Sequence, residues 1–230
     1  MVQVGILLRK YFPRVYGFCR TWILKKENVK LGDVVVQAGV DMTTCSSDVI
    51  YMSEIVGPGG LVIGIEPDKN NVQKINDYIR HHKITNIVIV EKAVWKVRGE
   101  FPLLMGKRSM DNRLEDISGI FDIKEIEAYT GTCMVETDTL DNILDDLGVE
   151  NISHIRLTIN GAELEVLEGM ERILSKKRDN GFSIIVAGGK TQPFGPLIGG
   201  EPTDKKIVSV LRKHKFQTRY DKKGWIIAWK

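Results

Sequence analysis

Short apolar runs alternating with helical patterns are the feature that most constrains how this chain folds. Val34–Ala38 and Leu61–Ile65 are largely apolar runs of the length of a buried strand, and residues 47–56 between them repeat apolar side chains at the helical period. Strands buried on both faces of a parallel sheet have this near-continuous apolar composition. Repeated strand–helix–strand units therefore predict a parallel sheet with right-handed crossovers.

The alternation continues along the chain. Further strands are expected at residues 86–90, 134–137, 154–159 and 183–187, and helices after Asp68 and over residues 140–147, 161–174 and 204–214. The last two strands, 216–220 and 224–229, flank a short turn and are expected to form an antiparallel hairpin. The irregular parts are residues 96–132, with an extended segment at 101–104 and a loop at 105–113, and the glycine-rich segment 188–200.

Length and composition indicate one domain with a small extension. The chain has 230 residues, of which 43% are hydrophobic and 27% charged, as in ordinary globular proteins. Residues 1–30 are expected to form an N-terminal helical extension, and residues 31–230 a single α/β domain. No apolar run has the roughly 18 residues that cross a membrane, and the three cysteines match neither a disulfide framework nor a zinc site. A cytoplasmic location is the expectation.

Basic residues are concentrated in residues 1–30 and 204–223, where they outnumber acidic residues. Such segments can contact phosphate groups, an anionic membrane surface or an acidic substrate. Solvated surface is the other interpretation.

Two residues at predicted strand ends indicate a nucleoside-bearing cofactor. Gly39 follows the first strand, where the absence of a side chain allows a ligand to approach the backbone. Glu66 follows the second strand, where a carboxylate can accept hydrogen bonds from two ribose hydroxyls. The structural alternatives are a tight turn at Gly39 and a helix cap at Glu66.

The motifs that bind phosphate are missing from this position. Residues 40–44, which follow Gly39, read Val-Asp-Met-Thr-Thr, so neither a dinucleotide fingerprint nor a phosphate-binding loop is present. One glycine-bearing turn and one ribose-type acid suit S-adenosylmethionine, which has no phosphate.

Several further motifs, taken in order, resemble the FkbM family of S-adenosylmethionine-dependent methyltransferases. They are Leu-Gly-Asp at 31–33, Val-Gly-Pro-Gly-Gly at 56–60, Ile-Glu-Pro at 65–67, Lys-Ala-Val at 92–94, Thr-Leu-Asp at 139–141 and Gly-Ala-Glu-Leu-Glu-Val-Leu-Glu-Gly at 161–169. The resemblance covers about residues 31–190. It implies a Rossmann-like class I methyltransferase fold over 31–230: a mostly parallel seven-stranded sheet, a C-terminal antiparallel hairpin and helices on both faces.

The resemblance also implies a cofactor site. Its expected members are Gly39, Asp41, Glu66, Pro67, Glu91 and Ala93. In the family, the residue matching Glu66 holds the ribose and those matching residues 91–93 lie by the adenine. Asp41 either contacts the methionine ammonium or caps the next helix, and Trp95 either shields the adenine or packs in the core.

Candidates on the substrate side follow the strand expected at 154–159. Asn160 and Arg156 are candidate substrate contacts, and Glu163 is the candidate general base. Alternatively, Asn160 and Glu163 form a capping box at the start of a helix, and Arg156 lies in solvent outside the strand end.

The chain departs from the family pattern at several polar positions. Residues of other types replace the usual acids at Gln37, Thr158, Asn160 and Ala187, an asparagine at Asp41 and a glycine at Thr43. With these acids missing, no metal site is predicted.

The sequence thus predicts methyl transfer to a hydroxyl oxygen of a small-molecule or glycosyl substrate. A methyltransferase-fold binding protein without catalysis is an alternative, because the substituted positions have lost charge. A second alternative is an RNA methyltransferase that uses the basic segments as a phosphate footprint, although no RNA-binding motif accompanies them.

Overall fold

The computed structural model of the chain describes residues 28–41, 48–115, 129–177, 181–187, 197–198, 201–222 and 224–230. The helical extension expected near the N-terminus, the family departure at Thr43 and most of the glycine-rich segment 188–200 lie outside these residues.

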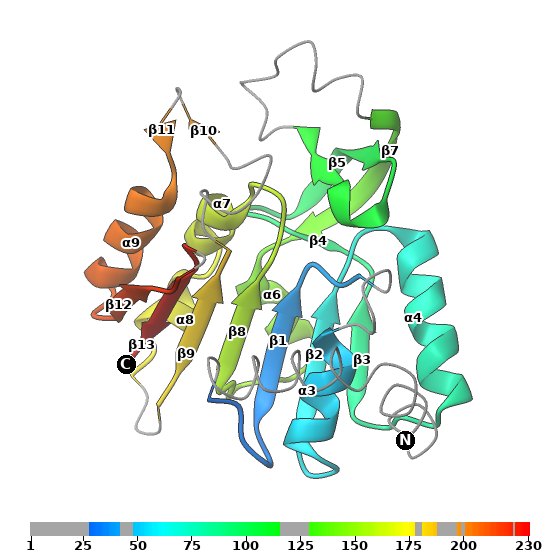
Figure 1. Cartoon of the computed structure of the whole chain (residues 1–230), viewed down its shortest axis with the longest axis horizontal. Helices are drawn as coiled ribbons and strands as arrows, with labels where there is room; N and C mark the ends of the chain where they lie inside the picture. The colour runs from blue at the N-terminus through cyan, green and yellow to red at the C-terminus, as the bar shows by residue number, and fades with distance from the viewer. Residues whose placement is uncertain are drawn as a thin grey trace.

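A seven-stranded sheet forms the centre of the molecule, with the strand order β12-β13-β9-β8-β1-β2-β3 (Figure 1). The strands are β1 (Val34–Ala38), β2 (Leu61–Ile65), β3 (Ile87–Val90), β8 (His154–Leu157), β9 (Ser183–Val186), β12 (Gln217–Tyr220) and β13 (Ile226–Trp229). Neighbouring strands from β9 to β3 pair in parallel, and β13 pairs antiparallel with both β9 and β12. The predicted class I methyltransferase sheet and its C-terminal hairpin are confirmed.

The central sheet is buried on both faces because successive strand residues point to opposite sides. Val36 belongs to one core cluster, and Val35, its neighbour in β1, to another. The cluster of Val36 includes residues of α6 (Leu140–Asp146), α7 (Glu163–Glu168), α8 (Glu171–Ser175) and α9 (Asp204–Lys213), and that of Val35 includes residues of α3 (Asp48–Val56) and α4 (Lys69–His81). Helices therefore cover both faces, as predicted.

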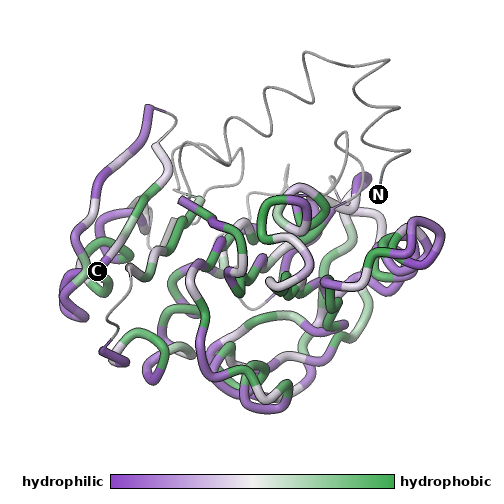
Figure 2. Tube along the Cα trace, turned by 90° about the horizontal axis from the view of Figure 1, so that it is seen from below, coloured by the Kyte–Doolittle hydropathy of each residue, from purple (hydrophilic) through white to green (hydrophobic). Residues whose placement is uncertain are grey.

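Helix α4 begins where the sequence predicts. Asp68 is its N-cap, and the side chain accepts a hydrogen bond of 3.0 Å from the backbone N–H of Asn70. Val72 and Ile75 are buried against the sheet. In Figure 2 the trace of this helix, at the right, is mostly hydrophilic, whereas hydrophobic segments lie toward the middle of the molecule. The helix is held by one apolar stripe.

A second sheet lies beyond the carboxyl ends of β2 and β3 (Figure 1). Its order is β4-β7-β5-β6, formed by β4 (Ala93–Val94), β5 (Gly99–Gly106), β6 (Arg113–Leu114) and β7 (Tyr129–Asp138). The extended segment predicted at 101–104 and the strand predicted at 134–137 are parts of β5 and β7, which are longer than expected and pair with each other over most of their lengths. Much of β7 is exposed, so its sequence lacks the apolar signal of a buried strand. A short antiparallel pair, β10 (Leu197–Ile198) with β11 (Glu201–Pro202), completes the described strands.

The single helix predicted over residues 161–174 is wrong, because the chain forms α7 and α8 with a break at Gly169 and Met170. A Cβ atom at Gly169 would lie 2.6 Å from the carbonyl oxygen of Trp95. The Asp141 carboxylate accepts hydrogen bonds from the backbone N–H groups of Arg172 and Ile173, at 2.8 and 3.1 Å, at the start of α8. Tertiary contacts at both ends of the break therefore override the helical periodicity.

Across the described ranges, no helix combines the length and the apolar character needed to cross a membrane.

Candidate functional site at the strand ends

The turn after β1 requires a glycine for a structural reason. Gly39 has a φ of +79°, and its N–H donates to the carbonyl of Ile65 at 3.0 Å. A Cβ atom there would lie 2.3 Å from the carbonyl oxygen of Thr158. The close approach of the chain after β8 therefore accounts for the glycine without a ligand, and the tight-turn interpretation holds.

Two substituted family positions meet beneath this turn. The Gln37 side chain is buried, and its Nε2 donates to Thr158 Oγ1 at 2.6 Å and to the carbonyl of Gly39 at 2.8 Å. Both residues replace acids that are usual in the family. A neutral amide–hydroxyl pair thus connects β1 with the end of β8.

Glu66 is placed at the end of β2 with its carboxylate directed at the neighbouring backbone. Oε2 accepts from the N–H of Val40 at 3.1 Å, and Oε1 accepts from the N–H of Asp68 at 3.0 Å. The N-cap residue of α4 is Asp68, and Glu66 contributes to this end of the helix only by accepting the N–H of Asp68. Each carboxylate oxygen has a second lone pair, so the group retains acceptor capacity for ribose hydroxyls.

Burial raises the pKa of Glu66 to about 8. The two backbone hydrogen bonds oppose this increase, and the nearby negative charges of Asp68 and Asp41 add to it. Glu66 is only 7% exposed. The site therefore contains a desolvated acid that is mostly protonated at pH 7 and ionises near pH 8.

A short segment of the second sheet crosses the ends of three central strands. It contains the 3-10 helix η1 (Ser109–Asp111) and the following Asn112. Ser109 Oγ donates to Asp41 after β1 at 3.0 Å, and Asn112 Nδ2 donates to Asp68 after β2 at 3.1 Å. Asn160, after β8, donates from Nδ2 to the Asn112 carbonyl at 2.8 Å. The sequence predicts here a loop that could cover the site, but it gives Ser109 and Asn112 no role, because their contacts depend on the unpredicted pairing of β5 with β7.

The remaining cofactor-site candidates are Pro67, Glu91 and Ala93. Pro67 follows Glu66 directly and is half-buried. Glu91 follows β3, is exposed, and lies 3.8 Å from Lys69 Nζ in an ion pair. Ala93 is buried in β4, where it is paired with β7. Trp95 is 1% exposed and packs in the core beside Phe101, which supports the packing interpretation over adenine shielding.

Glu163 and Asn160 do not form a capping box. The N-cap of α7 is Ala162, which makes no side-chain hydrogen bond there, and Asn160 is engaged with Asn112. Glu163 is 1% exposed, and neither carboxyl oxygen reaches a hydrogen-bond partner among the described residues. Burial raises the pKa of Glu163 well above its usual value.

Arg156 lies inside β8 and not in solvent beyond its end, so the solvent interpretation is wrong. Its side chain is buried, and Nη1 forms an ion pair of 2.8 Å with the Asp48 carboxylate at the start of α3. The guanidinium carbon lies 5.1 Å from the ring centroid of Trp225. The residue therefore supports the packing of α3 on the sheet.

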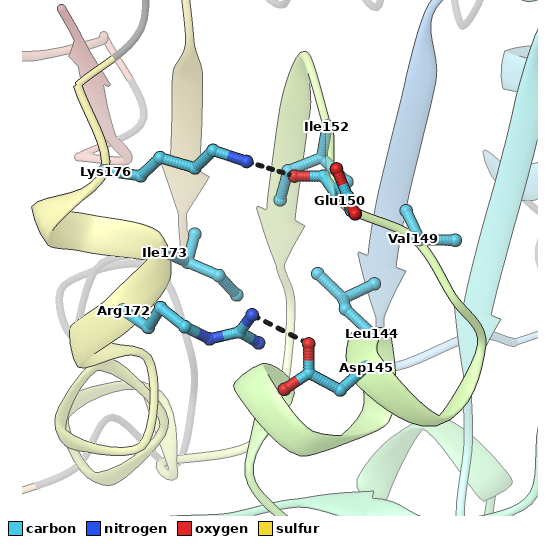
Figure 3. A pocket seen from close by; sticks show the side chains of 8 residues that line it. All are labelled: Leu144, Asp145, Val149, Glu150, Ile152, Arg172, Ile173 and Lys176. Carbon is cyan, nitrogen blue, oxygen red and sulfur yellow. Dashed lines mark hydrogen bonds and ion pairs between the residues drawn. The ribbon is translucent and has the colours of Figure 1, made fainter.

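A separate hollow of about 240 Å³ lies near the start of β8, at the opposite end of that strand from Asn160 (Figure 3). Arg172 pairs with Asp145 across it at 2.7 Å, and Lys176 Nζ donates to the Glu150 carbonyl at 2.8 Å. Its lining residues are Leu144, Asp145, Val149, Glu150, Ile152, Arg172, Ile173 and Lys176. None of them belongs to the candidate site.

The part of the chain that the structure describes contains no group of three or more His, Cys, Asp and Glu side chains that could hold a metal ion.

Comparison with known proteins gives a family match and a fold match. The family model described as "Methyltransferase FkbM domain" matches residues 33–218. Methyltransferase FkbM from Methylobacillus flagellatus KT is 14% identical with a TM-score of 0.53, over 86% of this chain and 43% of that chain. This chain therefore spans less than half the length of that protein. Precorrin-6y C5,15-methyltransferase from Geobacter metallireducens GS-15 is 14% identical with a TM-score of 0.50. The match covers 91% of this chain and 85% of that chain.

At these identities the two structural likenesses concern the fold alone, and no curated protein matches the sequence. The family match covers most of the chain, from the residue before β1 to the middle of β12. The chain belongs to the FkbM methyltransferase family.

Proposed function

We propose that this FkbM-family chain transfers the methyl group of its cofactor, S-adenosylmethionine, to a hydroxyl oxygen of a small-molecule or glycosyl acceptor. The observation that carries the proposal is the Glu66 carboxylate, buried at the carboxyl end of a central parallel strand. Ligands of open α/β sheets bind at this edge. The carboxylate has the remaining acceptor capacity that a ribose diol requires.

The residues around Glu66 fit the chemistry of this cofactor. Asp41 adds negative charge beside Glu66, where the positively charged methionine ammonium would lie. The turn at Gly39 lacks the phosphate-binding glycines, which suits a ligand without phosphate. We assign the ribose to Glu66, the ammonium to Asp41, the surroundings of the adenine to Pro67, Glu91 and Ala93, and a backbone contact to Gly39.

When bound, the cofactor supplies an electrophilic methyl group, so the protein mainly aligns the acceptor and excludes water. Alignment of two reactants can contribute about 7–11 kcal/mol to lowering a barrier. We assign Asn160 to the acceptor side, because it stands at the end of β8, next to β1. We leave Arg156 out of the acceptor side, because its ion pair with Asp48 supports α3.

Glu163 is our candidate for the base that takes the hydroxyl proton. Burial raises the pKa of Glu163, so its ionised form is a stronger base than an ordinary carboxylate. Such a base contributes about 10²–10⁴-fold to the rate. This assignment requires that the acceptor reach a side chain that is buried in the free protein.

A cofactor-binding protein without catalysis is the second candidate function. The observation that favours it is the neutral pair formed by Gln37 and Thr158, where the family usually has two acids. Both candidate functions require the same cofactor site, and they differ only in whether the chain catalyses methyl transfer.

Titration calorimetry with S-adenosylmethionine and S-adenosylhomocysteine tests the shared site. We expect both to bind, and Glu66→Gln to weaken binding by about 1–3 kcal/mol, because an amide keeps only one of the two acceptor oxygens. Glu100→Gln, an exposed position on β5, is the matched control and should bind as the wild type does. Absence of binding heat at millimolar ligand would contradict both candidate functions.

Formation of S-adenosylhomocysteine from small-molecule alcohols and glycosides separates the two candidates. We expect Glu163→Gln to keep the cofactor affinity and to lower turnover by about 10²–10⁴-fold. Unchanged turnover would remove Glu163 as the base. A wild-type chain that binds the cofactor but turns over no acceptor in such a panel would favour the binding protein.

A further inference from the structure

We infer that Asn112 is a positioning residue. It fixes the groups on the ribose side of the cofactor site relative to the groups on the acceptor side. The inference rests on the proposed function, because it gives Asn112 a role at that same site. Asn112 lies between η1 and β6, outside the motifs that carry the family resemblance.

Asn112 uses both ends of its side-chain amide and both of its backbone polar groups. Its Nδ2 donates to Asp68 Oδ2 at 3.1 Å, and its Oδ1 accepts from the N–H of Gly106 at 2.9 Å. Its carbonyl accepts from Asn160 Nδ2 at 2.8 Å, and its N–H donates to the Ser109 carbonyl at 3.2 Å. One residue thus joins β5, η1 and the ends of two central strands.

The contact with Asp68 leads directly to the ribose carboxylate. Asp68 is buried, and its second oxygen caps α4 through the N–H of Asn70. Its own N–H donates to Glu66 Oε1. The position of Asp68 therefore sets both the start of α4 and the orientation of Glu66, and Asn112 fixes that position from the opposite side.

The contact with Asn160 leads to the acceptor side. Asn160 follows β8, and the donor end of its amide is directed at the Asn112 carbonyl. In the same segment, Ser109 donates to Asp41, the residue assigned to the methionine ammonium. A shift of this segment would therefore move groups on both sides of the reacting centre, since all of them are hydrogen-bonded to it.

An amide is the side chain that this position requires. It donates to the Asp68 carboxylate and accepts from the N–H of Gly106 at the same time. An aspartate at position 112 would retain the acceptor but would place a carboxylate against the Asp68 carboxylate. Exchanging the two groups, as Asn112→Asp with Asp68→Asn, restores one amide and one carboxylate in reversed order. Asparagine is also an effective N-cap, so α4 keeps its cap in the exchanged pair.

The test measures the affinity of the full chain for S-adenosylhomocysteine in the wild type, Asn112→Asp and the exchanged double variant. We expect Asn112→Asp to weaken the affinity about tenfold, a typical coupling between residues of one hydrogen-bond network. The exchanged pair should recover most of that loss. Asn70→Asp adds the same charge at an exposed position of α4 and serves as the charge-matched control, with affinity close to the wild type.

Hydrogen exchange of the Gly106 and Asn112 amides in the unliganded chain supplies a second readout. Exchange should be faster in Asn112→Asp than in Asn70→Asp and should slow again in the exchanged pair. Equal affinities in Asn112→Asp and Asn70→Asp would overturn the inference and leave the proposed function intact. A loss that the exchanged pair fails to recover would also overturn it, whereas a wild-type chain that binds no cofactor refutes the proposed function itself.

Discussion

Gln37 Nε2 donates a hydrogen bond of 2.6 Å to Thr158 Oγ1, and the two residues lie 121 positions apart in the sequence. The resemblance to the FkbM family implies an acid at each of these positions. Two carboxylates at this separation could not both be ionised without strong repulsion. The two substitutions are thus compatible with each other, because the amide can donate to the hydroxyl, although Gln37 Oε1 is buried without a hydrogen-bond partner among the described residues.

The pair can be tested with Gln37→Glu, Thr158→Asp and the double variant. Each single variant leaves one partner that can donate to the new carboxylate, so each should be tolerated. At pH 7 the double variant should lose about 1–3 kcal/mol more unfolding free energy than the sum of the single losses. Urea unfolding measures this, and the excess should shrink in acid as one carboxyl becomes protonated. Additive losses at neutral pH would contradict the interpretation.

Gly39→Ala should destabilise the chain more than Gly148→Ala does. Both glycines have a positive φ, +79° and +65°, which costs an alanine about 1–2 kcal/mol. A Cβ at residue 148 meets no atom within 4 Å, whereas one at residue 39 meets the Thr158 carbonyl at 2.3 Å. We expect the overlap to add about 1–3 kcal/mol, measured by chemical unfolding. Equal losses of unfolding free energy in the two variants would show that the chain after β8 shifts away from the new Cβ without cost.

The raised pKa of Glu66 predicts a pH dependence of stability. The folded state binds the Glu66 proton more tightly than the unfolded chain, so this contribution is fully present below the unfolded pKa of 4.5 and is lost as pH rises through about 8. Within that window the unfolding free energy should fall by at most about 1.4 kcal/mol per pH unit from this group. In Glu66→Gln this component should vanish from urea unfolding curves. An identical pH dependence in the variant would contradict the assignment.

Asp138 is expected to change the unfolding free energy with pH in the direction opposite to that of Glu66. It is fully buried at the end of β7, and burial alone would raise its pKa, but hydrogen bonds from Asn142, Lys92 and Arg98 lower the pKa overall. Its contribution is therefore present above the unfolded pKa of 3.8 and is lost as pH falls through the lower folded pKa.

Asp138→Asn should cost about 2 kcal/mol at pH 7, because it removes hydrogen bonds to charged groups. Asp146→Asn is the control, since Asp146 pairs with the same Arg98 but is largely exposed and should cost less than about 1 kcal/mol. Urea unfolding at pH 7 and in acid checks both variants. A loss in Asp138→Asn that persists unchanged in acid would contradict the prediction.

The central sheet could be predicted because its strands are short apolar runs with clear boundaries. β1 and β2 have the expected ends, and Asp68 caps α4 as expected. The second sheet could not be predicted in the same way, because β5 and β7 have mixed exposure and their pairing is a long-range contact. The break between α7 and α8 was missed because it depends on the Trp95 backbone, which is distant in sequence.

For the candidate site, the sequence indicated the edge of the sheet but not the connections across it. Glu66 was identified from its place after an apolar strand, and the structure shows it buried there. The contacts of Ser109 and Asn112 with Asp41 and Asp68 join segments far apart in the chain. Periodicity and local motifs do not report contacts between distant segments. Such contacts are seen only once the chain is folded.

The place of β13 between β9 and β12 determines the order in which the sheet can be completed during synthesis. While the chain is still emerging from the ribosome, β12 leaves the exit tunnel before the strand that must separate it from β9. The nascent sheet therefore has an unpaired edge at β9, and β12 joins the sheet only after β13 has also emerged.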